Sequence, residues 1–189
     1  PESAAPFKGN IDIEKLQRCI KEKGAARIAF VRIEASLNMA GGQPFSMENL
    51  HAVSELCRAH KIFLLLDATR VSENAWFIQT RESGYERASL SSLVRDICDL
   101  TDGCTMSSKK DHYVPIGGFL ATRNKALYRR AKELVVAFEG SPHYGGMAGH
   151  DMAALAVGIR ESVNEDYVRH YVGQVVFLHR ELKRRGVPV

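Results

Sequence analysis

The sequence lacks the features that mark several protein classes. No apolar run approaches the roughly 18 residues that span a bilayer, and runs such as Ile62 to Leu66 have the length of a strand. The four cysteines lie far apart without a CxxC or CxxH pair, which argues against a disulfide framework and against a zinc site. Neither an internal repeat nor a low-complexity segment is present. We therefore expect a globular protein with reduced thiols, located in the cytoplasm and not associated with a membrane.

The composition is that of an ordinary folded domain. Of 189 residues, 45% are hydrophobic and 25% are charged, so one domain or a little more can bury a substantial core. The net charge of +4 is spread along the chain, and the densest basic cluster, Lys183 to Arg185, ends a predicted helix, where cations are favoured. A nucleic-acid binder usually concentrates its basic residues on one face. We therefore expect no nucleic-acid partner.

Strand-like apolar runs alternate with helical patterns along the chain. Asp12 and Gly24 bracket the first helical pattern, and Ser46 begins a second one that ends near His60. The other predicted helices cover residues 89–100, 125–137, 150–163 and 167–185, and the predicted strands cover residues 28–33, 62–66, 104–106 and 116–121. This alternation predicts an α/β fold in which helices cover a mostly parallel sheet.

Polar clusters follow three of the predicted strands. They are Asn38 with the glycine-rich stretch after it, Asp67 to Arg70, and Ser107 to Lys110. Ligands of parallel sheets bind beyond the carboxyl ends of the strands. We therefore expect the three clusters to converge on one site.

Asp67 and Arg70 each have a structural and a functional interpretation. An aspartate directly after a buried strand can cap a helix or form an ion pair. It can also keep the ring nitrogen of pyridoxal phosphate protonated, which that cofactor needs in order to act as an electron sink. Arg70 can be the ion-pair partner of Asp67, or it can bind the phenolate oxygen of the cofactor.

The lysine doublet and the glycine-rich stretch are also open to two interpretations. Lys109 and Lys110 are either solvated surface or a reactive pair. A lysine beside another cation and partly desolvated keeps a neutral amine, which is the form that makes a Schiff base. The Ser107 hydroxyl can bind a phosphate. Asn38, before Gly41 to Pro44, either belongs to a tight turn or places its amide against a ring oxygen.

Other residues with functional side chains give weaker signals. His143 and His150 are too far apart for one helical face and have no carboxylate at ligand spacing, so we expect no metal site there. Trp76 and Phe77, near a predicted turn, are more typical of packing than of stacking on a substrate.

Taken together, the motifs resemble those of the β-eliminating aromatic amino-acid lyases, the pyridoxal-phosphate-dependent family of tyrosine phenol-lyase and tryptophanase. The motifs occur in the family's order, and the resemblance runs nearly end to end. The matching stretches are Pro6–Asn10, Asn38–Pro44, Asp67–Arg70, Glu73–Ala75, Asp102–Ser107, Lys109–Asp111, Gly117–Gly118 and Glu139–Gly146. The resemblance implies the large domain of the fold type I, aspartate-aminotransferase-like enzymes.

The resemblance also implies a role for each residue that faces the cofactor ring. Lys110 would bind pyridoxal phosphate covalently and later transfer a proton at the substrate Cα. Asp67 would pair with the pyridinium nitrogen. Asn38 and Arg70 would contact the phenolate oxygen of the ring.

Three further residues receive roles from the same resemblance. Ser107 would bind the cofactor phosphate, and Lys109 would help to position the phosphate side and nearby water. A monovalent, potassium-like cation would be held partly by the backbone carbonyl of Pro115. The sequence departs from the family pattern at Ser108, where Gly or Ala is usual, and at Pro115, where one branch has Asn; neither change removes a chemical group.

The activity implied by the resemblance is β-elimination of an aromatic L-amino acid, which gives pyruvate, ammonium and the free aromatic ring. The Asp67–Arg70, Asp102–Ser107 and Lys132–Val136 stretches look more like the tyrosine branch, so L-tyrosine and phenol are expected. L-Tryptophan and indole are the alternative. The family also implies a homotetramer with active sites shared between subunits.

Family members are much longer than this chain, which opens at Pro1 without Met. We expect residues 1–166 to be an incomplete cofactor-binding domain and residues 167–189 to be a long helix leading into a truncated small domain. By itself the chain is expected to have little lyase activity.

Three other functions compete with this interpretation. Another pyridoxal-phosphate enzyme, such as an aminotransferase or a carbon–sulfur lyase, would not be expected to carry both glycine-rich loops. A non-catalytic remnant that serves in oligomerisation would not need Asn38, Asp67, Arg70 and Lys110 together. A nucleic-acid binder would show steeply salt-dependent affinity.

Overall fold

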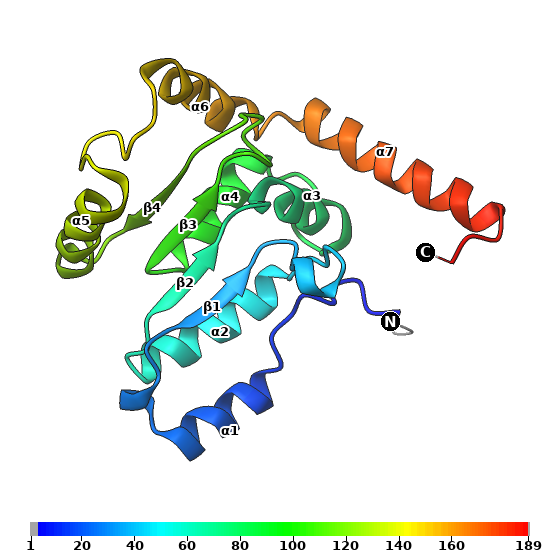
Figure 1. Cartoon of the computed structure of the whole chain (residues 1–189). Coiled ribbons are helices and arrows are strands. Elements are labelled where there is room, and N and C mark those ends of the chain that lie inside the picture. Colours follow the sequence, from blue (N-terminus) through cyan, green and yellow to red (C-terminus); the bar gives the residue numbers. More distant parts are fainter. Residues whose placement is uncertain (1–3, 189) are drawn as a thin grey trace.

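The computed structural model describes residues 4–188, which form an α/β fold (Figure 1). In chain order the elements are α1 (Ile13–Lys23), η1 (Ala25–Arg27), β1 (Val31–Glu34), η2 (Asn38–Ala40), α2 (Met47–Ala59), β2 (Leu64–Asp67), α3 (Val71–Arg81), α4 (Leu90–Asp99), β3 (Gly103–Ser107), β4 (Gly118–Thr122), α5 (Lys125–Glu139), α6 (Gly149–Glu161) and α7 (Glu165–Arg184), where η marks a short 3-10 helix.

The strands of the described residues form one sheet in the order β1-β2-β3-β4. β1, β2 and β3 are parallel, whereas β4 runs antiparallel to β3. The connection between β3 and β4, residues 108–117, contains no helix. It is too short for a parallel crossover, which needs about a dozen residues or more. The predicted α/β class and mostly parallel sheet are confirmed, with β4 as an antiparallel edge.

Within the described residues, helices pack against one face of the sheet. Ile33, Leu64 and Leu66 are almost completely buried and belong to a core that also contains residues of α2, α3 and α4. The alternate strand residues Arg32 and Asp67 remain partly exposed, because neighbouring strand residues point to opposite faces. In Figure 1, α2 and α4 lie behind the strands, so the opposite face is turned to the viewer.

Capping residues set the helix ends that the sequence predicts. The Asp12 carboxylate accepts a hydrogen bond from the Lys15 N–H at 2.9 Å, and Gly24 ends α1 with a φ of 79°. The Ser46 hydroxyl accepts from the Asn49 N–H at 3.1 Å at the start of α2. Each cap satisfies a backbone donor that has no partner inside its helix. These two predicted helix starts are confirmed.

Helix α3 is absent from the sequence prediction. Its inner side carries two buried polar residues, Ser72 and Asn74, and these interrupt the apolar spacing that identifies a helix. Trp76 and Phe77, predicted to lie near a turn, are in this helix and pack partly buried against the core. The predicted turn is therefore wrong, whereas the packing role of the two rings is confirmed.

The C-terminal helices join the core through close contacts. Val168 of α7 is fully buried, and α7 packs against α3. Gly158 of α6 lies so close to the backbone of His112 that an added Cβ would stand 1.9 Å from the His112 carbonyl oxygen. The division between a domain at 1–166 and a helix from residue 167 stays a prediction. Among residues 4–188, no helix is both long and apolar enough to span a bilayer.

The close approach at Gly158 predicts a stability change. Gly158→Ala should lower the free energy of unfolding by roughly 1–3 kcal/mol, because the methyl group would overlap the His112 carbonyl. Gly173→Ala is the matched control, since Gly173 lies within α7 with nothing within 4 Å of an added Cβ. This control should raise stability by up to about 1 kcal/mol. Urea unfolding followed by circular dichroism measures both, and equal effects of the two substitutions would contradict the packing argument.

Candidate active site

The strand register brings two of the predicted polar clusters together at one edge of the sheet. Asp67, at the end of β2, lies beside Thr105 of β3. Ser107 is the last residue of β3, and its N–H donates to the Thr69 hydroxyl at 3.3 Å. The segments Asp67–Arg70 and Ser107–Lys110 are therefore neighbours across the β2–β3 pair.

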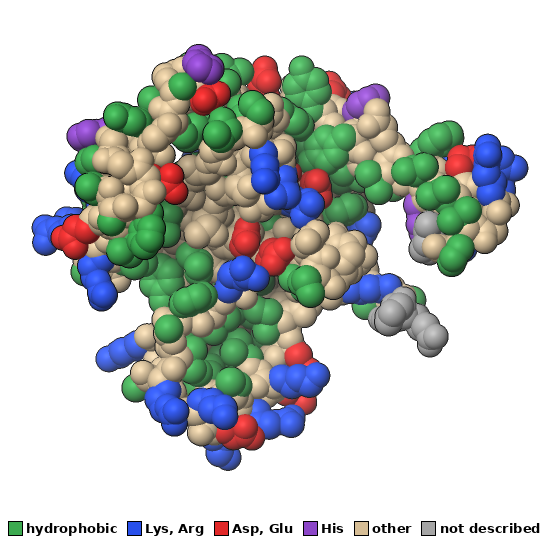
Figure 2. All heavy atoms as spheres, in the orientation of Figure 1, with side chains coloured by type: hydrophobic (Ala, Val, Ile, Leu, Met, Phe, Trp, Pro, Cys, Tyr) green, Lys and Arg blue, Asp and Glu red, His purple; other side chains and the backbone are tan. Residues whose placement is uncertain are grey.

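Asp67 lies on the face of the sheet that the described helices leave uncovered. Its side chain is 21% exposed, and its Oδ2 lies 3.8 Å from Nη1 of Arg32 on β1. The Thr69 N–H donates to its Oδ1 at 3.3 Å. Figure 2, which views the same face, shows acidic and basic side chains side by side near its middle. The carboxylate is thus fixed by a local turn and an ion pair, and it does not cap a helix.

Arg70 is the N-cap residue of α3, but its side chain makes no cap hydrogen bond. Its Nε lies 4.0 Å from the Glu73 carboxylate, with both side chains about a quarter exposed. The ion pair that the sequence suggests between Asp67 and Arg70 is therefore not the one formed. Each carboxylate is paired with a different arginine.

The segment that carries Asn38 is a compact loop at the end of β1. The Asn38 N–H donates to the Glu34 carboxylate at 3.0 Å, and the Asn38 side chain is exposed. The Leu37 N–H donates to the Gln43 carbonyl at 2.8 Å, which closes the loop. Gly41 has a φ of 76°, in the left-handed region that favours glycine. This tight turn places Asn38 beyond the carboxyl end of β1.

Asn74 of α3 fastens both ends of this loop. Its side-chain carbonyl accepts from the Ser36 N–H at 3.1 Å and from the Phe45 N–H at 3.0 Å. Its amide group donates to the Phe45 carbonyl at 3.0 Å. Asn74 is completely buried, so water cannot replace these bonds. The position of the Asn38 loop therefore depends on α3.

The lysine doublet lies in a turn that follows β3. The Ser108 N–H donates to the Gly117 carbonyl at 3.0 Å, and the Tyr113 N–H donates to the Lys110 carbonyl at 3.1 Å. Lys109 is exposed and Lys110 is half-buried. The Ser108 hydroxyl is buried and has no hydrogen-bond partner within residues 4–188. This turn presents the two lysines beside the end of the Asp67 strand.

Asp111, directly after the doublet, is buried and points to the start of α3. Its Oδ2 accepts from the Ser72 N–H at 2.8 Å. Burial, together with the nearby negative charge of Glu73, raises the pKa of Asp111 to about 7. Burial also raises the pKa of Glu73, although the Arg70 guanidinium opposes that shift. Two carboxyl groups with raised pKa values therefore lie behind the lysine turn.

Pro115, predicted to hold a cation through its carbonyl, is exposed beyond the lysine turn. Within the described part of the chain, no three His, Cys, Asp or Glu side chains are grouped to hold a metal ion. A single backbone carbonyl does not make a cation site. The cation stays a prediction.

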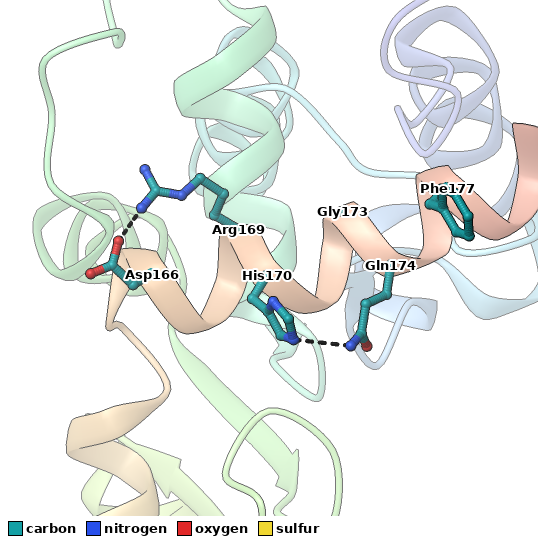
Figure 3. Close-up of a pocket in the computed structure, with 6 residues that line it drawn as sticks. All are labelled: Asp166, Arg169, His170, Gly173, Gln174 and Phe177. Carbon is teal, nitrogen blue, oxygen red and sulfur yellow. Dashed lines mark hydrogen bonds and ion pairs between the residues drawn. The ribbon is translucent and has the colours of Figure 1, made fainter.

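Two cavities among residues 4–188 border the lysine turn: one of about 330 Å³ includes Tyr113, and one of about 790 Å³ includes Met106 and Gly117. Two others lie away from it. One of about 770 Å³ is lined by residues of α7 alone: Asp166, Arg169, His170, Gly173, Gln174 and Phe177 (Figure 3). A single helix cannot enclose a ligand, so this is an open surface of α7. Another, of about 470 Å³, lies between the Gly41–Pro44 loop, α3 and α7. Neither has a lining residue among those predicted to bind a cofactor.

Three residues that support the predicted ones, Glu73, Asn74 and Asp111, carry no role predicted from the sequence. The motif stretches Glu73–Ala75 and Lys109–Asp111 contain them, so the signal was present in the sequence. Their contacts, however, join segments that are 29 to 39 residues apart along the chain. Such partners follow from tertiary structure alone.

The raised pKa of Asp111 predicts a pH-dependent stability. The folded pKa of about 7 exceeds the ordinary 3.8, so the folded protein holds this proton more tightly than the unfolded chain. The resulting stabilisation is fully present below about pH 4 and is lost as the pH rises to about 7, at up to roughly 1.4 kcal/mol per pH unit. Asp111→Asn should remove this slope, so the variant should gain stability relative to wild type over the same range.

Urea unfolding at several pH values between about 4 and 8 measures this slope. Asp96→Asn, which changes an exposed carboxylate on α4, is the control and should keep the wild-type pH dependence. Identical slopes for wild type and Asp111→Asn would show that Asp111 does not bind its proton more tightly in the folded protein.

Comparisons with known proteins agree with this geometry. A family model described as β-eliminating lyase matches residues 1–189. The chain is 51% identical over 189 residues to a tyrosine phenol-lyase of Intrasporangium calvum and 50% identical over 189 residues to one of Lacrimispora saccharolytica. Each match covers 100% of this chain and 40% of the relative. The chain thus spans about 40% of the length of these curated relatives.

Solved structures share the fold at low sequence identity. A Leishmania major threonine aldolase has a TM-score of 0.64 and 18% identity, over 97% of this chain and 50% of that one. A putative aromatic amino acid β-eliminating lyase/threonine aldolase from Exiguobacterium has a TM-score of 0.55 and 19% identity, over 72% of this chain and 34% of that one. These likenesses establish the fold, and the family match rests on sequence along the whole chain. The chain therefore belongs to the β-eliminating lyase family.

Proposed function

We propose that this chain supplies the pyridoxal-phosphate-binding part of a carbon–carbon lyase that eliminates the aromatic ring of L-tyrosine. The observation that carries the proposal is the pairing of two strand ends. The Asp67 carboxylate stands on the uncovered sheet face, and the turn with Lys110 follows the strand beside it. Membership of the β-eliminating lyase family supports the reaction class.

The residues at this edge suit pyridoxal phosphate. The cofactor requires a carboxylate at its ring nitrogen and a lysine for covalent attachment. Asp67 is fixed on the sheet, so its carboxylate can meet a cation without rearrangement. Ser107, Lys109 and the orphan hydroxyl of Ser108 offer donors on the next strand and turn. This set of groups matches the chemistry of a ring nitrogen, an aldehyde and a phosphate.

When bound, pyridoxal phosphate supplies an electron sink for the bond broken at Cα. Lys110 would hold the cofactor through its amine, and the same amine, when free, would accept the Cα proton of the substrate. Asp67 keeps the ring nitrogen protonated, and Asn38 and Arg70 hold the phenolate oxygen. Ser107 and Lys109 hold the phosphate side.

L-Tyrosine is the proposed substrate, with phenol, pyruvate and ammonium as products. Curated relatives about 50% identical to this chain are named tyrosine phenol-lyase, which favours phenol over indole as the leaving group. We further propose a cytoplasmic homotetramer with shared active sites and a potassium-like cation at the Pro115 carbonyl. The uncovered sheet face is consistent with such sharing, because other segments are needed to close a site there.

Covalent labelling tests the role of Lys110. The whole protein is incubated with pyridoxal phosphate and reduced with borohydride, and the labelled lysine is located by peptide mass spectrometry. We expect the label at Lys110, its loss in Lys110→Ala, and its retention in Lys21→Ala, which removes an exposed lysine on α1. Labelling of Lys110 no greater than that of other lysines would refute the assignment.

The leaving group is tested with the same loaded protein. L-Tyrosine should give equal amounts of phenol and pyruvate, and L-tryptophan should give much less indole. Indole as the faster product would replace the tyrosine assignment with tryptophanase activity. Lys110→Ala should form neither product at a measurable rate.

A further inference from the structure

Asp111 is the next residue after Lys110, yet its side chain is directed away from solvent. Its exposed fraction is 3%, and its Oδ2 lies 2.8 Å from the Ser72 nitrogen in the first turn of α3. Ser72 is itself buried. The contact therefore joins the lysine turn to a helix residue that lies 39 residues earlier in the chain.

Helix α3 has no cap of its own at this end. Its N-cap residue, Arg70, contributes no side-chain cap hydrogen bond. The first N–H groups of a helix need an acceptor, and a carboxylate there is also favoured by the helix dipole. Asp111 supplies this acceptor from outside the helix. The bond consequently connects the lysine turn to the start of α3, where Arg70 is the N-cap residue.

We propose that Asp111 is a positioning residue, which holds the Lys110 turn against the start of α3 so that the Lys110 amine meets the cofactor aldehyde. The proposal rests on the proposed function, in which Lys110 is the lysine that binds the cofactor. Two backbone hydrogen bonds, Ser108–Gly117 and Tyr113–Lys110, also shape the turn. Its far end is held by contacts of His112 with Gly158 and of Tyr113 with Tyr171, which lie beyond Asp111 along the chain. Without the Asp111 bond, Lys110 would sample positions away from the end of β2.

Three polar side chains surround Asp111. Glu73 faces it from α3, Tyr113 from its own loop, and Tyr171 from α7. Arg70 pairs with Glu73. The Tyr171 hydroxyl is buried and has no hydrogen-bond partner within the described residues. Asp111 instead accepts hydrogen bonds from backbone N–H groups in the first turn of α3, at Ser72 and Glu73.

Three variants of the whole protein test the proposal. Asp111→Ala removes the acceptor, and Asp111→Asn keeps an oxygen that can accept the same hydrogen bond. Asp12→Ala is the matched control, because Asp12 caps α1 through the Lys15 N–H and has no contact with the lysine turn. The first measurement is the rate at which pyridoxal phosphate becomes trapped on Lys110 by borohydride. The second is hydrogen exchange of the Ser72 amide without cofactor.

We expect Asp111→Ala to slow trapping at Lys110 roughly tenfold or more, since small displacements of a reacting group are costly. The Ser72 amide should exchange roughly tenfold faster in that variant. Asp111→Asn should stay within about threefold of wild type in both measurements, and Asp12→Ala should leave both unchanged. If Asp111→Ala does not fold, hydrogen exchange of the Ser72 amide in wild type tests the proposal instead. A Ser72 amide that exchanges as fast as exposed amides would overturn it.

Two outcomes separate this inference from the proposed function. Wild-type protein without label at Lys110 would refute the proposed function. The exchange rate of the Ser72 amide would still show whether Asp111 caps α3. Normal labelling of wild type combined with unchanged trapping in Asp111→Ala would refute the positioning role alone. An equal loss of trapping in Asp12→Ala would also overturn it, because general destabilisation would then explain the effect.

Discussion

The first turn of α3 is the part of the structure on which the candidate site depends. Its Ser72 N–H binds Asp111 of the lysine turn, and Asn74 binds both ends of the Asn38 loop. These bonds are buried, so water does not compete for the donors and acceptors, and an orphaned partner would cost about 1–3 kcal/mol. One helix end therefore sets the positions of the loops that follow β1 and β3.

The parallel register supplies the second constraint. β1, β2 and β3 all end at the same edge, so the residues that follow them must share that edge. Helices pack on one face within residues 4–188, and Asp67 stands on the other. This chain spans about 40% of the length of its curated relatives, and it contains the strand ends that carry the candidate residues. This arrangement explains why the candidate groups gather at one sheet edge.

The carboxylates near the candidate site have different partners. Arg32 pairs with Asp67 across β1 and β2, and Arg70 pairs with Glu73 within α3. Asp111 instead relies on a backbone N–H, and burial with the Glu73 charge raises its pKa. Asp67 thus has a cationic side chain beside it on the open face, whereas burial raises the pKa of both carboxyl groups behind the lysine turn.

The sequence by itself determined the local features and the chemistry. Short-range signals such as the Asp12 and Ser46 caps act within a few residues. The order of strand, Asp67, strand and Lys110 predicted the shared sheet edge, and the motif stretches along the whole chain indicated the family. Tertiary structure alone decided that α3 exists where Ser72 and Asn74 break the apolar pattern, that β4 turns back antiparallel, and that Arg32 is the partner of Asp67. The physical reason is distance along the chain. In the sequence, a polar residue such as Ser72 or Asn74 is read as part of a loop. Its burial in a helix is explained only by a partner dozens of residues away, which folding brings beside it.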